Sequence, residues 1–202
     1  MDNIKPEIFM DGEMWSMEYS VVMSGFGGQG ILMMGEMLAY CGMKAGLNVT
    51  WMPSYGAEMR GGTANCTVIL SEDRIGAPVV GQSAAVIAMS EPALQKFGSL
   101  VQEGGLLVVN SSLVEDDHPV EGQKARFISV PARELAARIG DEKMANMIML
   151  GAFMVGSEVI PFTQATRQVP SFLPLPRRQL APMIEKALYS GREYVLALEK
   201  RD

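Results

Sequence analysis

The most constraining feature of this sequence is a glycine-rich turn that joins a short apolar run to a helical pattern. The run Tyr19–Gly25 (YSVVMSG) has the length and composition of a buried strand, and GFGGQG follows at residues 25–30. From Ile31 to Gly46, apolar residues recur at helical spacing beside a second stripe of small residues. A strand, a tight turn and a helix in this order predict an α/β domain.

Short strands and helices continue to alternate along the rest of the chain. Further strands are expected at residues 47–52, where Pro53 would end the strand, and at 63–70, 84–90, 105–110 and 126–130. Helices are expected at 91–97, 132–139, 143–159 and 177–198, with a loop at 168–175 and Pro182 at the true start or at a kink of the last helix. The pattern predicts a three-layer α/β fold with a mainly parallel, or else mixed, sheet. In a chain of 202 residues, we expect an N-terminal arm at 1–18 and a single domain at 19–202.

Composition and charge exclude several classes of function. The formal net charge of −6 argues against nucleic acid, whose binders concentrate Lys and Arg on one face. The sequence contains neither an apolar stretch suited to a membrane helix nor a secretory signal, so we expect a cytoplasmic protein without a membrane partner. Two cysteines, Cys41 and Cys66, and the single His118 cannot complete a zinc or iron–sulfur site, so we interpret both thiols as buried structural groups.

The glycine turn matches the G-x-G-x-x-G pattern of dinucleotide-binding loops. It begins at Gly25, and backbone amides of Gly27, Gly28, Gln29 and Gly30 would face a phosphate at the positive end of the next helix. The acidic residue that should follow about 20 positions later, for the ribose, is missing. The missing acid counts against a nicotinamide dinucleotide, and the turn either binds a phosphate or another anionic group or only allows the helix to pack tightly.

A second unusual segment, PSYGAEMRGGT, spans residues 53–63. Its candidate ligand contacts are the polar side chains, the arginine and the open glycine amides, namely Ser54, Tyr55, Arg60, Gly61, Gly62 and Thr63. In a parallel sheet, this loop and the glycine turn would both lie at the carboxyl ends of neighbouring strands. The alternative is an ordinary turn with a solvated ion pair between Arg60 and Glu58.

Several segments together resemble the gamma subunit of 2-oxoacid:ferredoxin oxidoreductases, and are similar to the gamma domain of pyruvate:ferredoxin oxidoreductase. The resemblance spans about residues 19–198 and rests on GFGGQG, VTWMPSYGAEMRGGTANCTVILS, IGAPVV, GGLLVVNSS, VPA and ANMIMLGA. The long segment at residues 49–71 is the most specific of these, and its wording looks closest to members that act on 2-oxoglutarate or branched-chain 2-oxoacids.

The resemblance implies an incomplete Rossmann-like domain of gamma type that works inside a complex. Such enzymes oxidatively decarboxylate a 2-oxoacid to an acyl-CoA, here with 2-oxoglutarate favoured over a branched-chain 2-oxoacid or pyruvate. Thiamine diphosphate, Mg and 4Fe-4S clusters would belong to partner subunits: alpha, beta, and a ferredoxin-like delta subunit or ferredoxin. This chain would hold no cofactor alone, would assist assembly and contact coenzyme A, and would be inactive by itself.

We therefore expect the glycine turn and the loop at 53–63 to contact coenzyme A phosphates, a neighbouring subunit, or both. No catalytic residue and no metal ligand is assigned, because no nucleophile–base pair is visible and His118 lies in a polar, solvated segment. Two alternatives stay open: a stand-alone dinucleotide-binding reductase, and a non-catalytic nucleotide-binding scaffold. An exposed partner-binding patch would also let the isolated chain self-associate.

Overall fold

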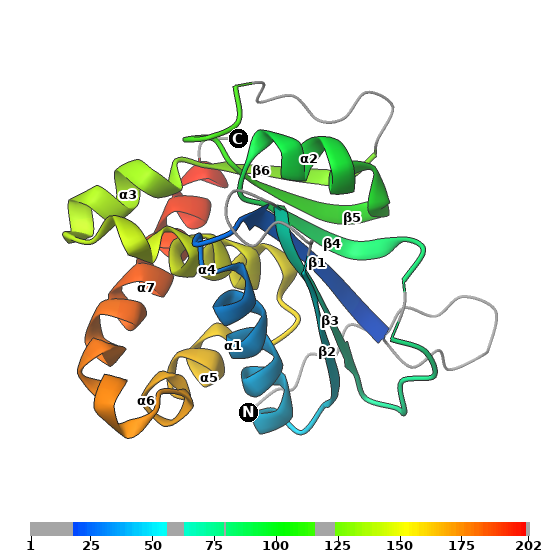
Figure 1. The fold of residues 1–202 in the computed structure, drawn as a ribbon, viewed down its shortest axis with the longest axis horizontal. Coiled ribbons are helices and arrows are strands. Elements are labelled where there is room, and N and C mark those ends of the chain that lie inside the picture. Colours follow the sequence, from blue (N-terminus) through cyan, green and yellow to red (C-terminus); the bar gives the residue numbers. More distant parts are fainter. Residues whose placement is uncertain (1–17, 56–62, 79, 116–123, 201–202) are drawn as a thin grey trace.

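The computed structural model describes residues 18–55, 63–78, 80–115 and 124–200, which form a mixed six-stranded sheet with helices on both faces (Figure 1). The strands are β1 (Glu18–Phe26), β2 (Asn48–Tyr55), β3 (Thr63–Ser71), β4 (Ser83–Ala88), β5 (Val101–Asn110) and β6 (Arg126–Val130). The α-helices are α1 (Ile31–Lys44), α2 (Glu91–Phe97), α3 (Ala132–Ile139), α4 (Ala145–Ser157), α5 (Phe162–Thr166), α6 (Val169–Phe172) and α7 (Ala181–Leu198). Short 3₁₀ helices are η1 (Gly98–Leu100), η2 (Glu142–Met144) and η3 (Leu175–Leu180).

The strand order is β2-β3-β1-β4-β5-β6. β1, β4, β5 and β6 run parallel, whereas β3 is antiparallel to both of its neighbours, β1 and β2. β2 therefore points in the same direction as β1, although β3 separates the two strands. The expected α/β class with a mixed sheet is confirmed, while the division into an arm and one domain stays a prediction.

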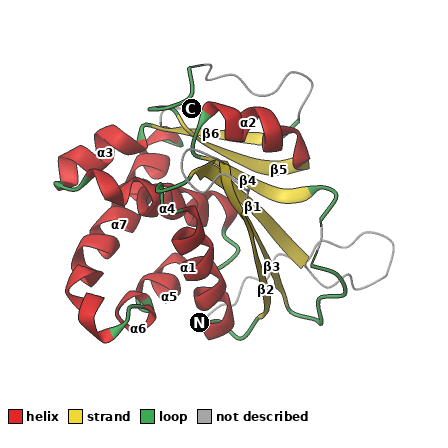
Figure 2. Ribbon diagram, viewed as in Figure 1, coloured by secondary structure: helices red, strands yellow, loops and turns green. Residues whose placement is uncertain are grey.

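Each face of the sheet has its own hydrophobic core, which explains why β1 is buried on both sides. Val21 and Met23 join a large core under α1 and the helices α3 to α7, and Val22 joins a smaller core under α2. Alternate residues of a strand point to opposite faces, so the continuous run of apolar residues in β1 follows from these two layers. Figure 2 shows the helices on either side of the strands.

The helices α4 and α7 pack with their backbones in direct contact. A Cβ atom added at Gly151 of α4 would lie 2.1 Å from the carbonyl oxygen of Leu188, and one at Gly191 of α7 would lie 1.9 Å from that of Ile148. Only glycine fits at either position. Three methionines of α4 are fully buried in the large core: Met147, Met149 and Met154.

Several expected boundaries differ from the structure. β2 continues through Pro53 to Tyr55. Proline has no backbone N–H to donate, and an edge strand such as β2 tolerates it because one side of the strand has no partner strand. The loop expected at 168–175 is wrong, since it contains α6 and enters η3, and α5 was not anticipated. The last helix begins at Ala181 rather than 177, with Pro182 in its first turn, and so Pro182 marks its start.

None of the helices in the described part of the chain combines the length and the apolar character that a membrane-spanning segment needs.

Candidate functional site

The glycine turn lies at the carboxyl end of β1 and leads directly into α1. Gly28 and Gly30 adopt the left-handed backbone conformation, with φ of 93° and 76°, a region in which glycine is strongly favoured. Gly27 and Gly28 are exposed, and a side chain at Gly28 would meet no atom within 4 Å. The middle of the turn is therefore open to a ligand.

The side chain of Gln29 ties the turn to the end of β4. Its Oε1 accepts a hydrogen bond from the Phe26 amide at 2.6 Å, and its Nε2 donates to the Met89 carbonyl at 3.3 Å. The Gln29 amide itself donates to the Phe26 carbonyl at 3.2 Å, inside the turn. A side chain at Gly25 would collide with Met89 Cβ at 2.7 Å. Gln29 and Gly25 thus shape the turn, and Gly27 and Gly28 present its free surface.

Asn146, at the start of α4, holds the other end of the turn. It is buried, and its Nδ2 donates to the Gly30 carbonyl at 3.1 Å while its Oδ1 accepts from the Met147 amide at 2.9 Å. A Cβ atom at Gly30 would lie 2.3 Å from Asn146 Nδ2. Sequence reasoning missed this residue, whose one signal is a polar side chain in the otherwise apolar run ANMIMLGA.

The amino terminus of α1 faces this turn without a side-chain cap among the described residues. Gly30 occupies the N-cap position, and no acidic residue lies in the first turn of the helix. The first amides of an α-helix have no partner within the helix, and the helix dipole adds positive potential there. Such an end is suited to bind an anionic group.

β2 ends and β3 begins at the edge of the sheet where the glycine turn follows β1. Phe26 pairs with Thr63 across β1 and β3, and Tyr55 pairs with Ala64 across β2 and β3. The expectation that the two loops follow neighbouring strands needs correction, because β3 lies between β1 and β2. Ser54 is exposed and Thr63 is half-buried.

Three residues of the predicted site, Arg60, Gly61 and Gly62, lie outside the described residues, and the side chain of Tyr55 is not described either. His118, to which no role was assigned, also lies outside them.

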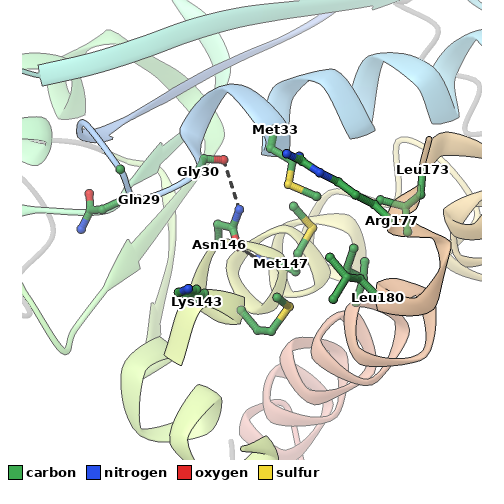
Figure 3. Close-up of a pocket in the computed structure, with 12 residues that line it drawn as sticks. Gln29, Gly30, Met33, Lys143, Asn146, Met147, Leu173, Arg177 and Leu180 are labelled. Atoms are coloured by element: carbon green, nitrogen blue, oxygen red, sulfur yellow. Dashed lines mark hydrogen bonds between the residues drawn. The ribbon is translucent and has the colours of Figure 1, made fainter. Parts of the chain in front are cut away.

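Two pockets flank the glycine turn and share Gly28, Gln29 and Lys143 (Figure 3 shows the first). The first, which we call the methionine pocket, has a volume of about 280 Å³. It is lined by Gly28, Gln29, Gly30, Met33, Lys143, Met144, Asn146, Met147, Leu173, Arg177, Leu180 and Ile184. The second, which we call the crevice pocket, has a volume of about 310 Å³. It is lined by Gly28, Gln29, Met89, Asn110, Leu113, Arg133, Glu142, Lys143 and Ala145.

The crevice pocket lies where the sheet changes the side on which its connections run. After β1 the chain crosses by α1 on one face, and after β4 it crosses by α2 on the other. In open α/β sheets, ligands bind at the carboxyl ends of the strands beside such a switch point. Asn110, at the end of β5, contributes a buried amide whose Oδ1 accepts from the Ser112 amide at 3.2 Å.

Positive charge borders both pockets. Within the described residues, neither Lys143 nor Arg177 forms an ion pair, whereas Arg133 pairs with Glu142 at 3.5 Å. Figure 3 shows Arg177 extended across the methionine pocket toward Met33 in the first turn of α1. Lys143 and Arg177 were not anticipated as site residues, because each comes from a segment more than 100 positions beyond the turn.

Both cysteines are free and buried, as expected from the sequence. Burial is the main cause that raises the pKa of both Cys41 and Cys66 to about 12. Their thiols lie 3.6 Å from backbone carbonyl oxygens of Ala165 and Ile31, respectively. Across the described ranges, no group of three His, Cys, Asp or Glu side chains is placed to hold a metal ion.

Comparison with known proteins places this fold and turn in a defined context. Residues 20–194 match the family model described as pyruvate ferredoxin/flavodoxin oxidoreductase. The ketoisovalerate oxidoreductase subunit VorA of Methanothermobacter thermautotrophicus is 33% identical over 177 residues, which cover 88% of this chain and 36% of VorA. The 2-oxoglutarate synthase subunit KorC of Methanothermobacter marburgensis is 29% identical over 189 residues, which cover 91% of this chain and all of KorC. The chain thus spans only about a third of the length of VorA.

Solved structures agree with these matches. The gamma subunit of a keto/oxoacid ferredoxin oxidoreductase from Geobacter sulfurreducens superposes with a TM-score of 0.74 at 29% identity, covering 89% of this chain and 99% of that one. A 2-oxoglutarate:ferredoxin oxidoreductase from Magnetococcus marinus, solved with 2-oxoglutarate, coenzyme A and succinyl-CoA, gives a TM-score of 0.76. At 20% identity, covering 89% of this chain and 31% of that one, the latter likeness concerns the fold alone.

Proposed function

The chain belongs to the pyruvate ferredoxin/flavodoxin oxidoreductase family, and we propose that it works as the gamma subunit of a 2-oxoacid:ferredoxin oxidoreductase. The observation that carries this proposal is the family match across residues 20–194, which includes the glycine turn and every strand from β1 to β6 except the first residues of β1. The similarity to KorC over the whole of that subunit supports the same role.

In the proposed complex, a 2-oxoacid anion, coenzyme A and two oxidised ferredoxins yield an acyl-CoA, carbon dioxide, two reduced ferredoxins and one proton. The thiamine diphosphate, Mg and 4Fe-4S clusters would reside in alpha, beta and delta partners or in ferredoxin. Similarity to both VorA and KorC leaves two substrate classes, branched-chain 2-oxoacids and 2-oxoglutarate, and of these we favour 2-oxoglutarate.

The role we propose for this chain's own residues is to hold coenzyme A, whose thiol accepts the acyl group. The exposed amides of Gly27 and Gly28, with the uncapped start of α1, suit a phosphate. Ser54 and Thr63 lie at the same edge and add hydroxyl groups, and Arg60 in the loop between them adds a cation. The crevice pocket gives the rest of such a ligand a concave surface beside this turn.

The geometry argues against the first alternative, a stand-alone dinucleotide-binding reductase. In the usual dinucleotide-binding fold, the second strand lies beside the first, and its terminal acid reaches the ribose. Here β3 separates β2 from β1, so the end of β2 lies about 10 Å from β1, twice the usual strand spacing. An acid at Ser54 would be one strand too far away. The second alternative, a non-catalytic scaffold, predicts assembly without any effect on 2-oxoacid oxidation.

The experiment that tests the function is recovery of the tagged chain from its host without oxygen, followed by an activity assay. We expect larger oxidoreductase subunits in the eluate and coenzyme A-dependent reduction of a viologen dye with one of several 2-oxoacids. An eluate with intact partners that oxidises none of these acids would contradict the gamma-subunit proposal and favour a scaffold.

The coenzyme A role has a separate test in the assembled complex. Arg60→Ala should raise the apparent KM for coenzyme A about tenfold or more, because a charge-assisted hydrogen bond contributes about 1.5–3 kcal/mol. The subunits should still assemble. Arg74→Ala is the matched control, since Arg74 is exposed beyond the opposite end of β3. An unchanged KM in Arg60→Ala would remove Arg60 from coenzyme A binding.

A further inference from the structure

The segment η3 exposes apolar residues beside the methionine pocket. It has the sequence LPRRQL, and none of its six residues is buried; Leu175 is 75% exposed and Leu180 is 39% exposed. Pro174 and Pro176, whose own backbone φ angles are fixed, flank Leu175 on both sides and limit the conformations of the chain there. A single exposed leucine is ordinary, but two exposed leucines beside an apolar pocket are typical of a contact surface.

The methionine pocket itself is apolar at its floor and cationic at its rim. Leu173, Leu180 and Met147 line it from three different elements or their ends, with Arg177 lying across it and Lys143 on the far side (Figure 3). Apolar side chains in a pocket surrounded by charged groups are the usual form of an interface hot spot.

The charge at this surface has the opposite sign to that of the whole chain. Arg177 and Arg178 are both in η3, which contains no acid, while the chain has a net charge of −6. Arg177 and Lys143 form no ion pair with any described residue. Their complement is a carboxylate supplied from outside.

From these observations we propose that η3 and the methionine pocket form a docking surface for a partner subunit. A segment of that subunit inserts an apolar side chain into the pocket and places a carboxylate against Lys143 and Arg177. A protein segment fits better than a small ligand, because Leu175 lies outside the pocket lining, where only a wider contact covers it. The identity of the partner as an oxidoreductase subunit rests on the proposed function.

The first test is co-purification of the assembled complex with Arg177→Glu and Leu180→Asp combined in the tagged chain. Asp is favoured at an N-cap, the position Leu180 occupies in α7, so this change does not oppose the helix. We expect at least a tenfold loss of partner subunits with an unchanged circular dichroism spectrum. Lys200→Glu, an exposed charge reversal just beyond the far end of α7, is the matched control and should retain them.

The outcomes separate this surface from the gamma-subunit proposal. Full retention of partners by the double variant would overturn the docking surface and leave the proposed function standing. A wild-type chain that recovers no oxidoreductase subunit would overturn the proposed function, and this partner with it. If coenzyme A raises the Tm of the wild-type chain but not of the double variant, a small ligand occupies the surface and the proposal is overturned. The proposal is likewise overturned if the isolated wild-type chain is a dimer and the double variant a monomer, because a second copy then occupies the surface.

The second test detects the carboxylate directly. Treatment of the purified complex with a water-soluble carbodiimide joins an amine to a carboxylate within contact distance, with loss of water. We expect mass spectrometry to find an amide between Lys143 Nζ and an Asp or Glu of a partner subunit. Lys143→Arg, which removes the amine and keeps the positive charge, should abolish that link. Links from Lys143 to carboxylates of its own chain alone would overturn the proposed contact.

Discussion

Replacing Gly30 with alanine tests whether the contact between Asn146 and Gly30 stabilises the glycine turn. Gly30 and Gly28 both adopt positive φ, so alanine at either position costs about 1–2 kcal/mol of backbone strain. Their surroundings differ: the new methyl group at Gly28 meets open space, whereas at Gly30 it would lie 2.3 Å from Asn146 Nδ2. Gly28→Ala is therefore the matched control for Gly30→Ala.

The difference between the two variants measures the packing of Asn146 alone. The methyl group at Gly30 must displace a buried amide that donates to the Gly30 carbonyl, and an unsatisfied buried polar group costs about 1–3 kcal/mol. Unfolded-state effects of Gly→Ala are common to both variants and cancel. For a chain of this size the expected difference in Tm is about 2–12 °C, with Gly30→Ala the less stable.

Urea denaturation and thermal unfolding of the purified chain provide the assay. In a double-mutant cycle, Asn146→Ala should remove the collision, so that Gly30→Ala costs less in its presence by about 1 kcal/mol or more. Equal stability of Gly30→Ala and Gly28→Ala, together with strict additivity in the cycle, would refute the view that Asn146 holds the turn.

Three further predictions concern the core. Gly191→Ala should lower the free energy of unfolding by about 3 kcal/mol or more in urea denaturation, because its methyl group would press on the α4 backbone. Gly76→Ala, whose methyl group would meet open space, is the control and should be nearly neutral. Similar urea midpoints for both variants would contradict the close contact of α4 and α7. Cys41 and Cys66 should resist iodoacetamide at pH 8 in the folded chain and react on unfolding, as counted by mass spectrometry. Because the pKa of both thiols is raised in the folded state, the free energy of unfolding should fall as pH rises from about 9 toward 12. Replacing both thiols by alanine should lessen that fall. An equal fall in the alanine variant would mean that other groups cause it.

Local sequence patterns predict the elements that are built from local interactions. β1, α1 and β3 lie within a few residues of their expected bounds, because strand composition and helical spacing act over short distances. The direction and position of β3 in the sheet, in contrast, depend on contacts with distant strands. Its β-branched residues indicate a strand, but nothing in Thr63–Ser71 specifies that it inserts antiparallel between β1 and β2.

The candidate site shows the same limit. The glycine turn is visible in the sequence because its residues are contiguous, and its place between a strand and a helix was predicted. Asn146, Lys143 and Arg177 come to the turn only through the packing of distant helices, which no spacing rule records. The short helices α5 and α6 were missed since each is too brief to display a helical period.

The glycines Gly151 and Gly191 allow the backbones of α4 and α7 to pack in direct contact. At these two positions each helix occupies the space that a side chain of the other would need, so the pair packs without a gap. η3 precedes α7 directly, and Asn146 stands at the first turn of α4 with its amide on Gly30. η3 and the glycine turn are therefore joined through one pair of helices whose backbones are in direct contact.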